Sequence, residues 1–323
     1  MTDRESAGGT DAFGRYLPPE APPASVPPPL PPAPPPLPDG VVAASPVAAM
    51  PTTTPPPTWK PWLGFAATLL AFGSAALLGA ILLAATGSIK DGKLDEQASP
   101  GALIGSVVLQ DVLFVAAALG LAAAMAKPHP WHFGWRPVRA FWPAVGWAAL
   151  LLGSFFVFTA LWLAVTGNTE QKDTIAQDLG ADSSLAAAIA IAILVSIGAP
   201  IVEELLFRGV LFGSLRQKMR VLPAAAITGV LFGLAHVAGS PIAFIVPLIF
   251  LGAGLCLLYH KTGSLYPSMA VHAINNGVAI VSALKWEWWL TFVVVGGALS
   301  VIAATAWLVR SRTAPVPADA PSP

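Results

Sequence analysis

Long runs of apolar residues, each close to the length of a membrane-spanning helix, dominate the chain from Trp62 onward. A helix needs about 20 mostly apolar residues to cross the hydrocarbon layer of a bilayer. The pattern therefore predicts an all-α fold, a polytopic membrane helical bundle with about eight transmembrane helices. Their approximate limits are 62–87, 102–126, 141–166, 185–213, 222–238, 241–259, 265–284 and 288–309.

The regions outside these runs have a different composition. Residues 1–60 contain most of the 33 prolines and few aromatic residues. Such a sequence cannot bury a core and favours extended, solvated backbone, so it predicts a disordered Pro/Ala-rich tail. It lacks the basic region and apolar core of a secretory signal, and we expect it to be retained. The membrane domain is expected at 61–310, with a short disordered tail at 311–323.

Overall composition supports the membrane assignment and excludes one class of function. Hydrophobic residues make up 55% of the chain and charged residues 11%, with a mean hydropathy of +0.69. The 17 basic and 17 acidic side chains cancel, so the chain has no basic excess for nucleic acid. The single cysteine, Cys256, excludes an internal disulfide and a multi-cysteine metal site, and we expect it to be a buried packing residue.

The distribution of lysine and arginine predicts the orientation, because cytoplasmic loops carry the excess. If the N-terminus is cytoplasmic, ten basic residues near the spans lie inside and four outside. We therefore expect a multi-pass protein of the cell membrane with both termini in the cytoplasm. The inner residues are Lys60, Lys127, Arg136, Arg139, Arg216, Lys218, Arg220, Lys261, Arg310 and Arg312; the outer ones are Lys90, Lys93, Lys172 and Lys285.

Three ionisable side chains interrupt the fourth apolar run, at Glu203, Glu204 and Arg208. Ionisable groups at membrane depth are costly unless paired, and they mark functional sites. Glu204 and Arg208 stand four residues apart on one helical face, where their side chains can meet. Glu203 lies about 100° round the helix, so its carboxylate is left available.

Further polar groups occur in two later runs. Phe232 and His236 fall near the end of the fifth run, and His272 and Asn276 lie four residues apart in the seventh. If these helices pack against the fourth, the side chains can converge on one polar cavity, which a bilayer tolerates better than scattered polar groups.

These three motifs, Glu-Glu-x-x-x-Arg, Phe-x-x-x-His and His-x-x-x-Asn, resemble those of the type II CAAX prenyl endopeptidases and bacterial Abi proteins, also called CPBP intramembrane proteases. They occur in the family's order within about 185–285, the expected catalytic core. The resemblance implies a membrane endopeptidase. It implies that Glu203 and His236 form the hydrolytic pair, and that His272 and Asn276 form the oxyanion site.

The residues themselves suggest the same division of labour. Glu203 is the expected general base, with His236 holding the attacking water. Glu204 is expected to pair with Arg208, while His272 and Asn276 donate hydrogen bonds to the developing oxyanion. The expected partners are membrane lipid and a membrane-associated protein or peptide substrate. In eukaryotic relatives that substrate is a prenylated protein, but the substrate of this chain stays open.

The role of metal also stays open at this point. Glu203, His236 and His272 could ligate a catalytic Zn²⁺ and leave a fourth position for water. The helical His-Glu-x-x-His pattern of many zinc proteases is absent from the sequence. The family has been described both as metalloproteases and as metal-independent glutamate proteases.

Two other functions compete with proteolysis. Glu203 and Glu204 could form a proton relay in a transporter, although no repeated halves are visible in the sequence. A non-enzymatic membrane scaffold or bacteriocin self-immunity protein could use the same fold. Gln110 and Asp111, polar at depth in the second run, match none of these motifs. We expect them to be structural partners for another helix, with a role in a substrate groove as the alternative.

Overall fold

A computed structural model describes residues 59–95, 98–171 and 174–312. These residues belong to one compact unit that begins at Thr53. The predicted tail at 1–60 lies almost wholly outside the described residues, and so do residues 313–323 of the predicted C-terminal tail.

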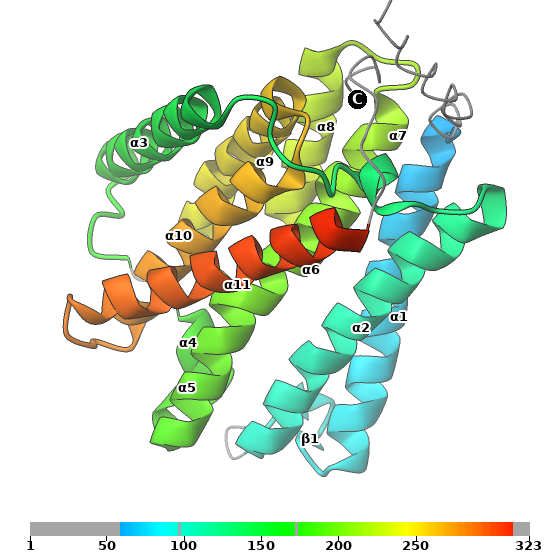
Figure 1. The fold of residues 1–323 in the computed structure, drawn as a ribbon. Helices are drawn as coiled ribbons and strands as arrows, with labels where there is room; N and C mark the ends of the chain where they lie inside the picture. Colours follow the sequence, from blue (N-terminus) through cyan, green and yellow to red (C-terminus); the bar gives the residue numbers. More distant parts are fainter. Residues whose placement is uncertain (1–58, 96–97, 172–173, 313–323) are drawn as a thin grey trace, which may run out of the picture. The chain divides into compact units, whose positions relative to one another are not determined.

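All eight apolar runs form helices, and the fold is helical as predicted (Figure 1). A two-stranded antiparallel hairpin joins the first two long helices. The elements are α1 (Pro61–Ala85), β1 (Ile89–Lys90), β2 (Lys93–Leu94), α2 (Pro100–Met125), η1 (Pro130–Phe133), α3 (Phe141–Val165), α4 (Ile175–Asp178), η2 (Ala181–Ser183), α5 (Leu185–Ile193), η3 (Leu194–Gly198), α6 (Ala199–Glu204), η4 (Leu205–Phe212), α7 (Gly213–Leu215), α8 (Val221–Leu234), α9 (Ile242–Thr262), α10 (Leu265–Ala283) and α11 (Leu290–Arg312).

Within the described residues, six helices are long and apolar enough to cross a membrane. They are α1, α2, α3, the helix Leu185–Leu215, α9 and α11. The expected fifth span, α8, has 14 residues and is a shorter apolar helix. The expected seventh, α10, has 19 residues but carries His272, Asn275 and Asn276. The molecule is therefore a multi-pass helical membrane protein in which the two shorter or more polar helices carry much of the candidate chemistry.

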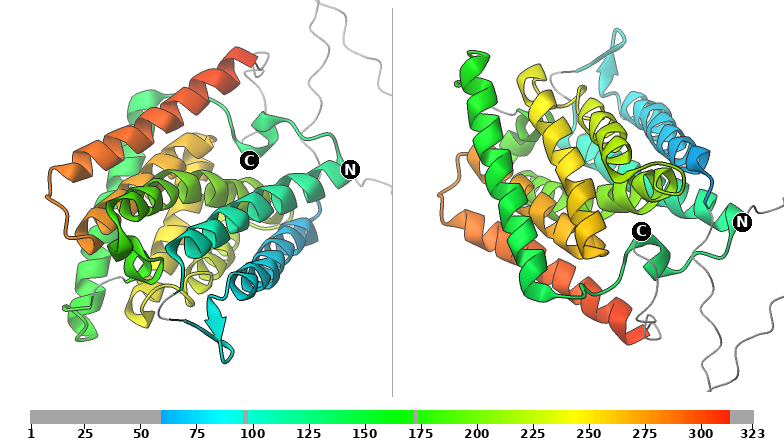
Figure 2. Two further views of the ribbon diagram at one scale, coloured as in Figure 1. Left: turned by 90° about the horizontal axis from the view of Figure 1, so that it is seen from below. Right: turned by 90° about the horizontal axis from the view of Figure 1, so that it is seen from above.

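The helix Leu185–Leu215, which runs from α5 to α7, is the central element of the bundle. Ser184 begins it as an N-cap, because its hydroxyl accepts a hydrogen bond from the Ala187 amide at 3.1 Å. It packs against α1 and α2 on one side and against α8, α9 and α10 on another (Figures 1 and 2). The candidate residues of the fourth run are thereby surrounded by helices.

Two π-helical segments, η3 and η4, interrupt this helix on either side of α6. A π-helical turn adds a residue to the helix and rotates the side chains beyond it, and such turns are frequent at functional sites. Pro200 follows η3 closely and has no backbone N–H to continue the usual hydrogen-bond ladder. The glutamates of α6 thus lie between two local changes of helical register.

Close helix contacts place backbone groups beside the centre of the bundle. A side chain at Gly229 would meet the Ala253 nitrogen at 2.7 Å, and one at Gly252 would meet Phe232 at 3.0 Å. Only glycine allows α8 and α9 to approach this closely. The Gly252 carbonyl therefore reaches the interior, where it meets a side chain of η4.

A proline inside α9 interrupts the backbone hydrogen bonds of that helix, and a side chain of a neighbouring helix replaces the missing donor. Pro247 cannot donate to the carbonyl of Ala243 four residues earlier. The indole Nε1 of Trp162, on α3, donates to that carbonyl at 2.9 Å. An orphaned backbone acceptor in a spanning helix is thus satisfied by a side chain from its neighbour, as the bilayer interior requires.

Candidate functional site

Glu204 is the centre of a fully buried polar cluster. Its Oε1 accepts hydrogen bonds from Arg208 Nη1 at 2.9 Å and from His272 Nδ1 at 2.9 Å. The ion pair expected from the i, i+4 spacing of Glu204 and Arg208 is therefore formed. His272, which comes from α10, joins the same carboxylate and links two helices.

The Arg208 guanidinium has two further neighbours. Nη2 donates to the Gly252 carbonyl at 3.0 Å, and the Phe232 ring centroid lies 4.6 Å from its central carbon. A buried arginine is tolerated when its charge is paired and its donors are used. The cation is thus engaged by a carboxylate, a backbone carbonyl and an aromatic face.

Glu203 has a different environment from its neighbour. Its side chain is 13% exposed, and its Oε2 lies 4.0 Å from Nε2 of His272. This oxygen is buried as an atom and has no hydrogen-bond partner among the described residues. The separation from Nε2 is longer than a hydrogen bond, so a small molecule between the two atoms could contact both.

His272 therefore faces a carboxylate with each ring nitrogen. The bond from Nδ1 to Glu204 fixes the ring orientation and directs Nε2 toward Glu203. A buried carboxylate that holds one nitrogen of a histidine and aims the other at reacting groups is a recurrent arrangement in hydrolases. The sequence predicted that His272 would lie near the glutamates, but its bond to Glu204 is an additional finding.

His236 lies beside this cluster but outside the helix that was expected to hold it. The fifth helix ends at Leu234, earlier than the predicted limit of 238, and His236 follows in a turn. Its Nδ1 is 2.8 Å from the Phe232 carbonyl, which leaves Nε2 available. Among the described residues, no ion pair or hydrogen bond joins His236 to Glu203.

Phe232 connects the two histidines. Its ring centroid is 4.8 Å from that of His236 and 5.6 Å from that of His272. The side chain is fully buried and contacts Arg208 as well. Both imidazoles therefore lie around one aromatic ring, and the structure brings the three sequence motifs into one neighbourhood.

Asn276 follows His272 by one helical turn but contacts a different element. Its Nδ2 donates to the Val195 carbonyl of η3 at 2.9 Å, and its Oδ1 accepts from Asn275 at 3.1 Å. The sequence predicted an oxyanion donor at this position. One amide hydrogen is committed to the backbone, and the second hydrogen of the same amide is left for another acceptor.

Asp111, for which the sequence suggested only a structural role, also faces the site. Its Oδ2 lies so near Gly198 that a Cβ added there would approach it to 3.1 Å, and its carboxylate interacts electrostatically with Glu203. No hydrogen bond or ion pair is found for Asp111 among the described residues. Its signal was an acidic residue deep in an apolar run, but sequence could not show which helix it meets.

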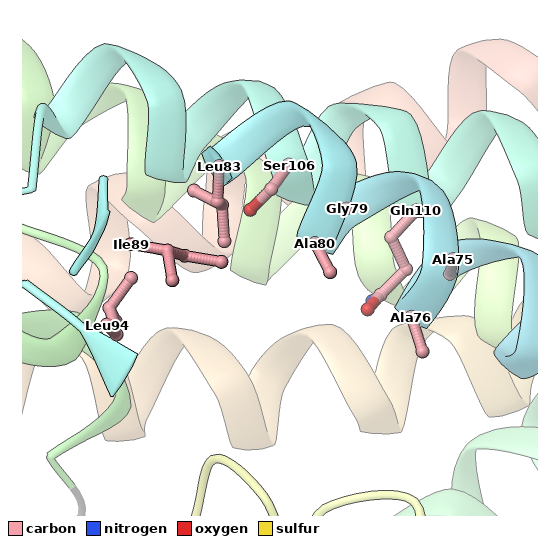
Figure 3. A pocket seen from close by; sticks show the side chains of 9 residues that line it. All are labelled: Ala75, Ala76, Gly79, Ala80, Leu83, Ile89, Leu94, Ser106 and Gln110. Carbon is pink, nitrogen blue, oxygen red and sulfur yellow. The ribbon is translucent and has the colours of Figure 1, made fainter. Parts of the chain in front are cut away.

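Gln110, the neighbour of Asp111, points elsewhere. With Ser106 it lines a hollow of about 340 Å³ between α1, the hairpin and α2 (Figure 3). The other lining residues are small or aliphatic side chains of α1 and the hairpin. Asp111 and Gln110, although adjacent in the second run, therefore lie in different surroundings: Asp111 near Gly198 and Gln110 at the hollow beside α1.

The predicted zinc ligands, Glu203, His236 and His272, come from three different parts of the bundle. In the described part of the chain, no group of three or more His, Cys, Asp or Glu side chains is arranged to hold a metal ion. Nδ1 of His272 is bonded to Glu204 and Nδ1 of His236 to a backbone carbonyl. These bonds leave Nε2 of both histidines free, as in many metal-ligating histidines, so a zinc site at Glu203, His236 and His272 stays a prediction.

Fold and site together define a class: a multi-pass helical membrane protein with a buried Glu-Arg-His cluster beside the less buried carboxylate of Glu203. Residues 185–278 match the family model of the type II CAAX prenyl endopeptidase Rce1-like proteins. This segment is therefore an Rce1-like domain, which confirms the resemblance seen in the motifs. It contains all six candidate residues from Glu203 to Asn276.

One curated protein is also similar to part of this chain. The chain is 28% identical over 93 residues to "Putative membrane peptidase YdiL" of Bacillus subtilis (strain 168). The matched segment covers 29% of this chain and 37% of that protein. No solved structure matches the chain significantly.

Proposed function

We propose that this protein is an intramembrane endopeptidase that hydrolyses a peptide bond of a membrane-associated protein or peptide. One observation carries the proposal: the unpartnered Oε2 of Glu203 stands 4.0 Å from a histidine nitrogen whose ring is held by Glu204. The Rce1-like match over 185–278 supports the same activity.

In this proposal the attacking water binds between Glu203 Oε2 and His272 Nε2. Glu203 takes a proton from the water as its oxygen attacks the carbonyl carbon, and a tetrahedral intermediate forms. The proton passes to the leaving nitrogen by way of Glu203 or His272 Nε2, and the C–N bond breaks. The products are a carboxylic acid and an amine, and both carboxylates regain their starting state.

Oxyanion stabilisation is assigned to the donors that remain free. His272 can donate from Nε2 once it carries a proton there, and Asn276 retains one amide hydrogen beyond the bond to Val195. His236, whose Nε2 is free beside Phe232, is proposed to hold the water or the substrate carbonyl. Glu204 and Arg208 orient His272 and do not contact the reacting atoms.

The proposed steps use only these side chains, and a metal-dependent route through Glu203, His236 and His272 is the alternative. We expect cleavage to continue after chelation and dialysis. If activity disappears on chelation and returns with added Zn²⁺, the metal-independent mechanism is wrong.

The proposed substrate region is close to the cytoplasmic leaflet, as the distribution of basic residues suggests. The first test is cleavage of membrane-anchored reporter peptides by purified protein in lipid, with products identified by mass spectrometry. Glu203→Gln is the inactive comparison. Asp91→Asn, on the exposed hairpin turn, is the matched control and should retain full activity.

Comparative proteomics of membrane fractions identifies the natural substrate. A precursor should accumulate in cells that carry Glu203→Gln and disappear in cells that carry the native protein. A scaffold or self-immunity protein would keep its phenotype in Glu203→Gln cells, and a transporter would show proton-coupled flux in liposomes. Either result without cleavage would overturn the proposal.

A further inference from the structure

The π-helical segment η3 leaves one backbone carbonyl without a helical partner. The Ala199 N–H reaches back five residues to the Leu194 carbonyl, which is the π-helical register. The next donor in that register is residue 200, and Pro200 has no N–H. In this register the Val195 carbonyl therefore has no backbone N–H to accept from.

Asn276 supplies the missing donor. Its Nδ2 bonds the Val195 carbonyl at 2.9 Å across the interface of α10 and η3. The arrangement at Pro247 is equivalent, since there the indole of Trp162 bonds the Ala243 carbonyl that the proline cannot reach. In both places a neighbouring helix satisfies an acceptor that a proline has freed.

The location of this bond matters for the site. Val195 lies eight residues before Glu203, and Asn276 lies four residues after His272. The bond thus joins the helix that carries the proposed base to the helix that carries the histidine facing it. The hydrogen bond between Glu204 and His272 joins the same two helices at a second point, nearer the C-terminal end of the helix Leu185–Leu215.

We propose that Asn276 is a positioning residue for the hydrolytic reaction, whose amide replaces the donor that Pro200 removes and so holds Glu203 in register with His272. This inference rests on the proposed function for its kinetic consequences. It adds to, and is separable from, the expected donation to the oxyanion. Pro200 and Val195 belong to the same arrangement, because Pro200 lacks the backbone donor and Val195 provides the acceptor.

The test is a double-mutant cycle between Asn276→Ala and Pro200→Ala. Loss of the Asn276 donor should lower kcat by about 10- to 100-fold with KM changed by less than about threefold, because the orphaned carbonyl loosens η3. Pro200→Ala alone restores a backbone N–H and should change kcat by less than about threefold. The double variant should have a clearly higher kcat than Asn276→Ala alone, because the backbone N–H that Pro200→Ala restores can bond the Val195 carbonyl; only the part of the loss that is due to oxyanion donation should remain.

The same cycle overturns the inference if rescue fails. Should Asn276 act only by donating to the oxyanion, its loss would be equally large in both backgrounds. Gln177→Ala is the matched control, because Gln177 Nε2 likewise bonds a backbone carbonyl, that of Ala283, at 2.7 Å outside the site. Pro200→Ala should not rescue any defect of that variant.

Hydrogen exchange measured by mass spectrometry separates this inference from the proposed function. Amides of residues 194–204 should exchange faster in Asn276→Ala and return to the native rate in the double variant. Gln177→Ala should leave this segment unchanged. If the protein cleaves no peptide, the proposed function fails, yet this measurement still decides the inference. Unchanged exchange in Asn276→Ala would overturn it.

Discussion

Two adjacent glutamates have opposite surroundings in this molecule. Glu204 is fully buried, and its Oε1 accepts from both Arg208 and His272. Glu203 keeps some exposure, makes no hydrogen bond at Oε2 and interacts electrostatically with the carboxylate of Asp111. The second oxygen of Glu204 also lacks a hydrogen-bond partner among the described residues, so the two glutamates differ in their cation, their histidine bond and their exposure. We therefore expect Glu204 to be a structural carboxylate and Glu203 to be the reactive one. A charge whose hydrogen bonds are used stabilises the fold, whereas a charge left unpaired is available for chemistry.

The largest expected effect tests the reactive side. Glu203→Gln should lower kcat by about 10³-fold or more, because an amide cannot take a proton from water. Its unfolding midpoint should not fall below that of the native protein, since the lost charge accepts no hydrogen bond at Oε2 and repels the carboxylate of Asp111. Turnover and thermal unfolding of the purified variant in detergent check both statements. Full activity, or a clear loss of stability, would erase the distinction between the two glutamates.

The next effect tests the structural side. Arg208→Met should destabilise the protein by about 3–5 kcal/mol, because it leaves the Glu204 carboxylate buried without its cation. Equilibrium unfolding in mixed detergent micelles measures the change. The double variant Glu204→Gln/Arg208→Met, in which both charges are removed, should recover part of that stability. A single variant as stable as the native protein would show that the pair is not structural.

A smaller effect of opposite sign is expected at Asp111. This carboxylate is held beside another carboxylate without any cation, so Asp111→Asn should stabilise the protein by about 1 kcal/mol. Residues retained at a cost in stability commonly serve activity, and we expect cleavage to fall in this variant. The comparison is Asp91→Asn, whose exposed side chain should change neither stability nor cleavage. A destabilised Asp111→Asn protein would mean that Asp111 is a structural partner.

The last prediction concerns pH and lies outside the site. Burial, followed by the nearby His129, lowers the pKa of His132 in η1 from 6.5 to about 4. Between these values the unfolded chain binds a proton that the folded chain does not bind. The stabilising contribution is complete above about pH 6.5 and is lost as pH falls toward 4. His132→Gln should flatten this part of the pH–stability curve, as thermal unfolding at several pH values would show. An unchanged dependence of stability on pH in His132→Gln would show that His132 does not cause the loss of stability at acid pH.

The helices could be predicted from sequence because length and hydropathy suffice to define a membrane span. The Glu204–Arg208 pair could also be predicted, since both partners lie on one helix at a fixed spacing. The end of α8 before His236 could not, because apolar composition continues beyond the last hydrogen-bonded turn. Short apolar stretches do not reveal where a helix ends.

Contacts between helices were the harder part of the site. The bond from Asn276 to Val195 depends on a π-helical register that ordinary periodicity does not reveal. Asp111 faces Glu203 only because α2 packs on η3 and α6, which the sequence does not encode locally. Sequence therefore identified most of the residues of the site. It did not identify which atoms meet.

The Glu204–Arg208 pair also has a consequence for biosynthesis. The helix Leu185–Leu215 leaves the ribosome before α8, α9 and α10 exist, so none of their groups can help it enter the bilayer. An isolated charge at the centre of an inserting helix costs about 2.5–3.5 kcal/mol on the translocon scale. Because arginine and glutamate lie one turn apart, the segment brings its own counter-ion into the lipid. Only Glu203 must wait for later helices to give it a polar environment.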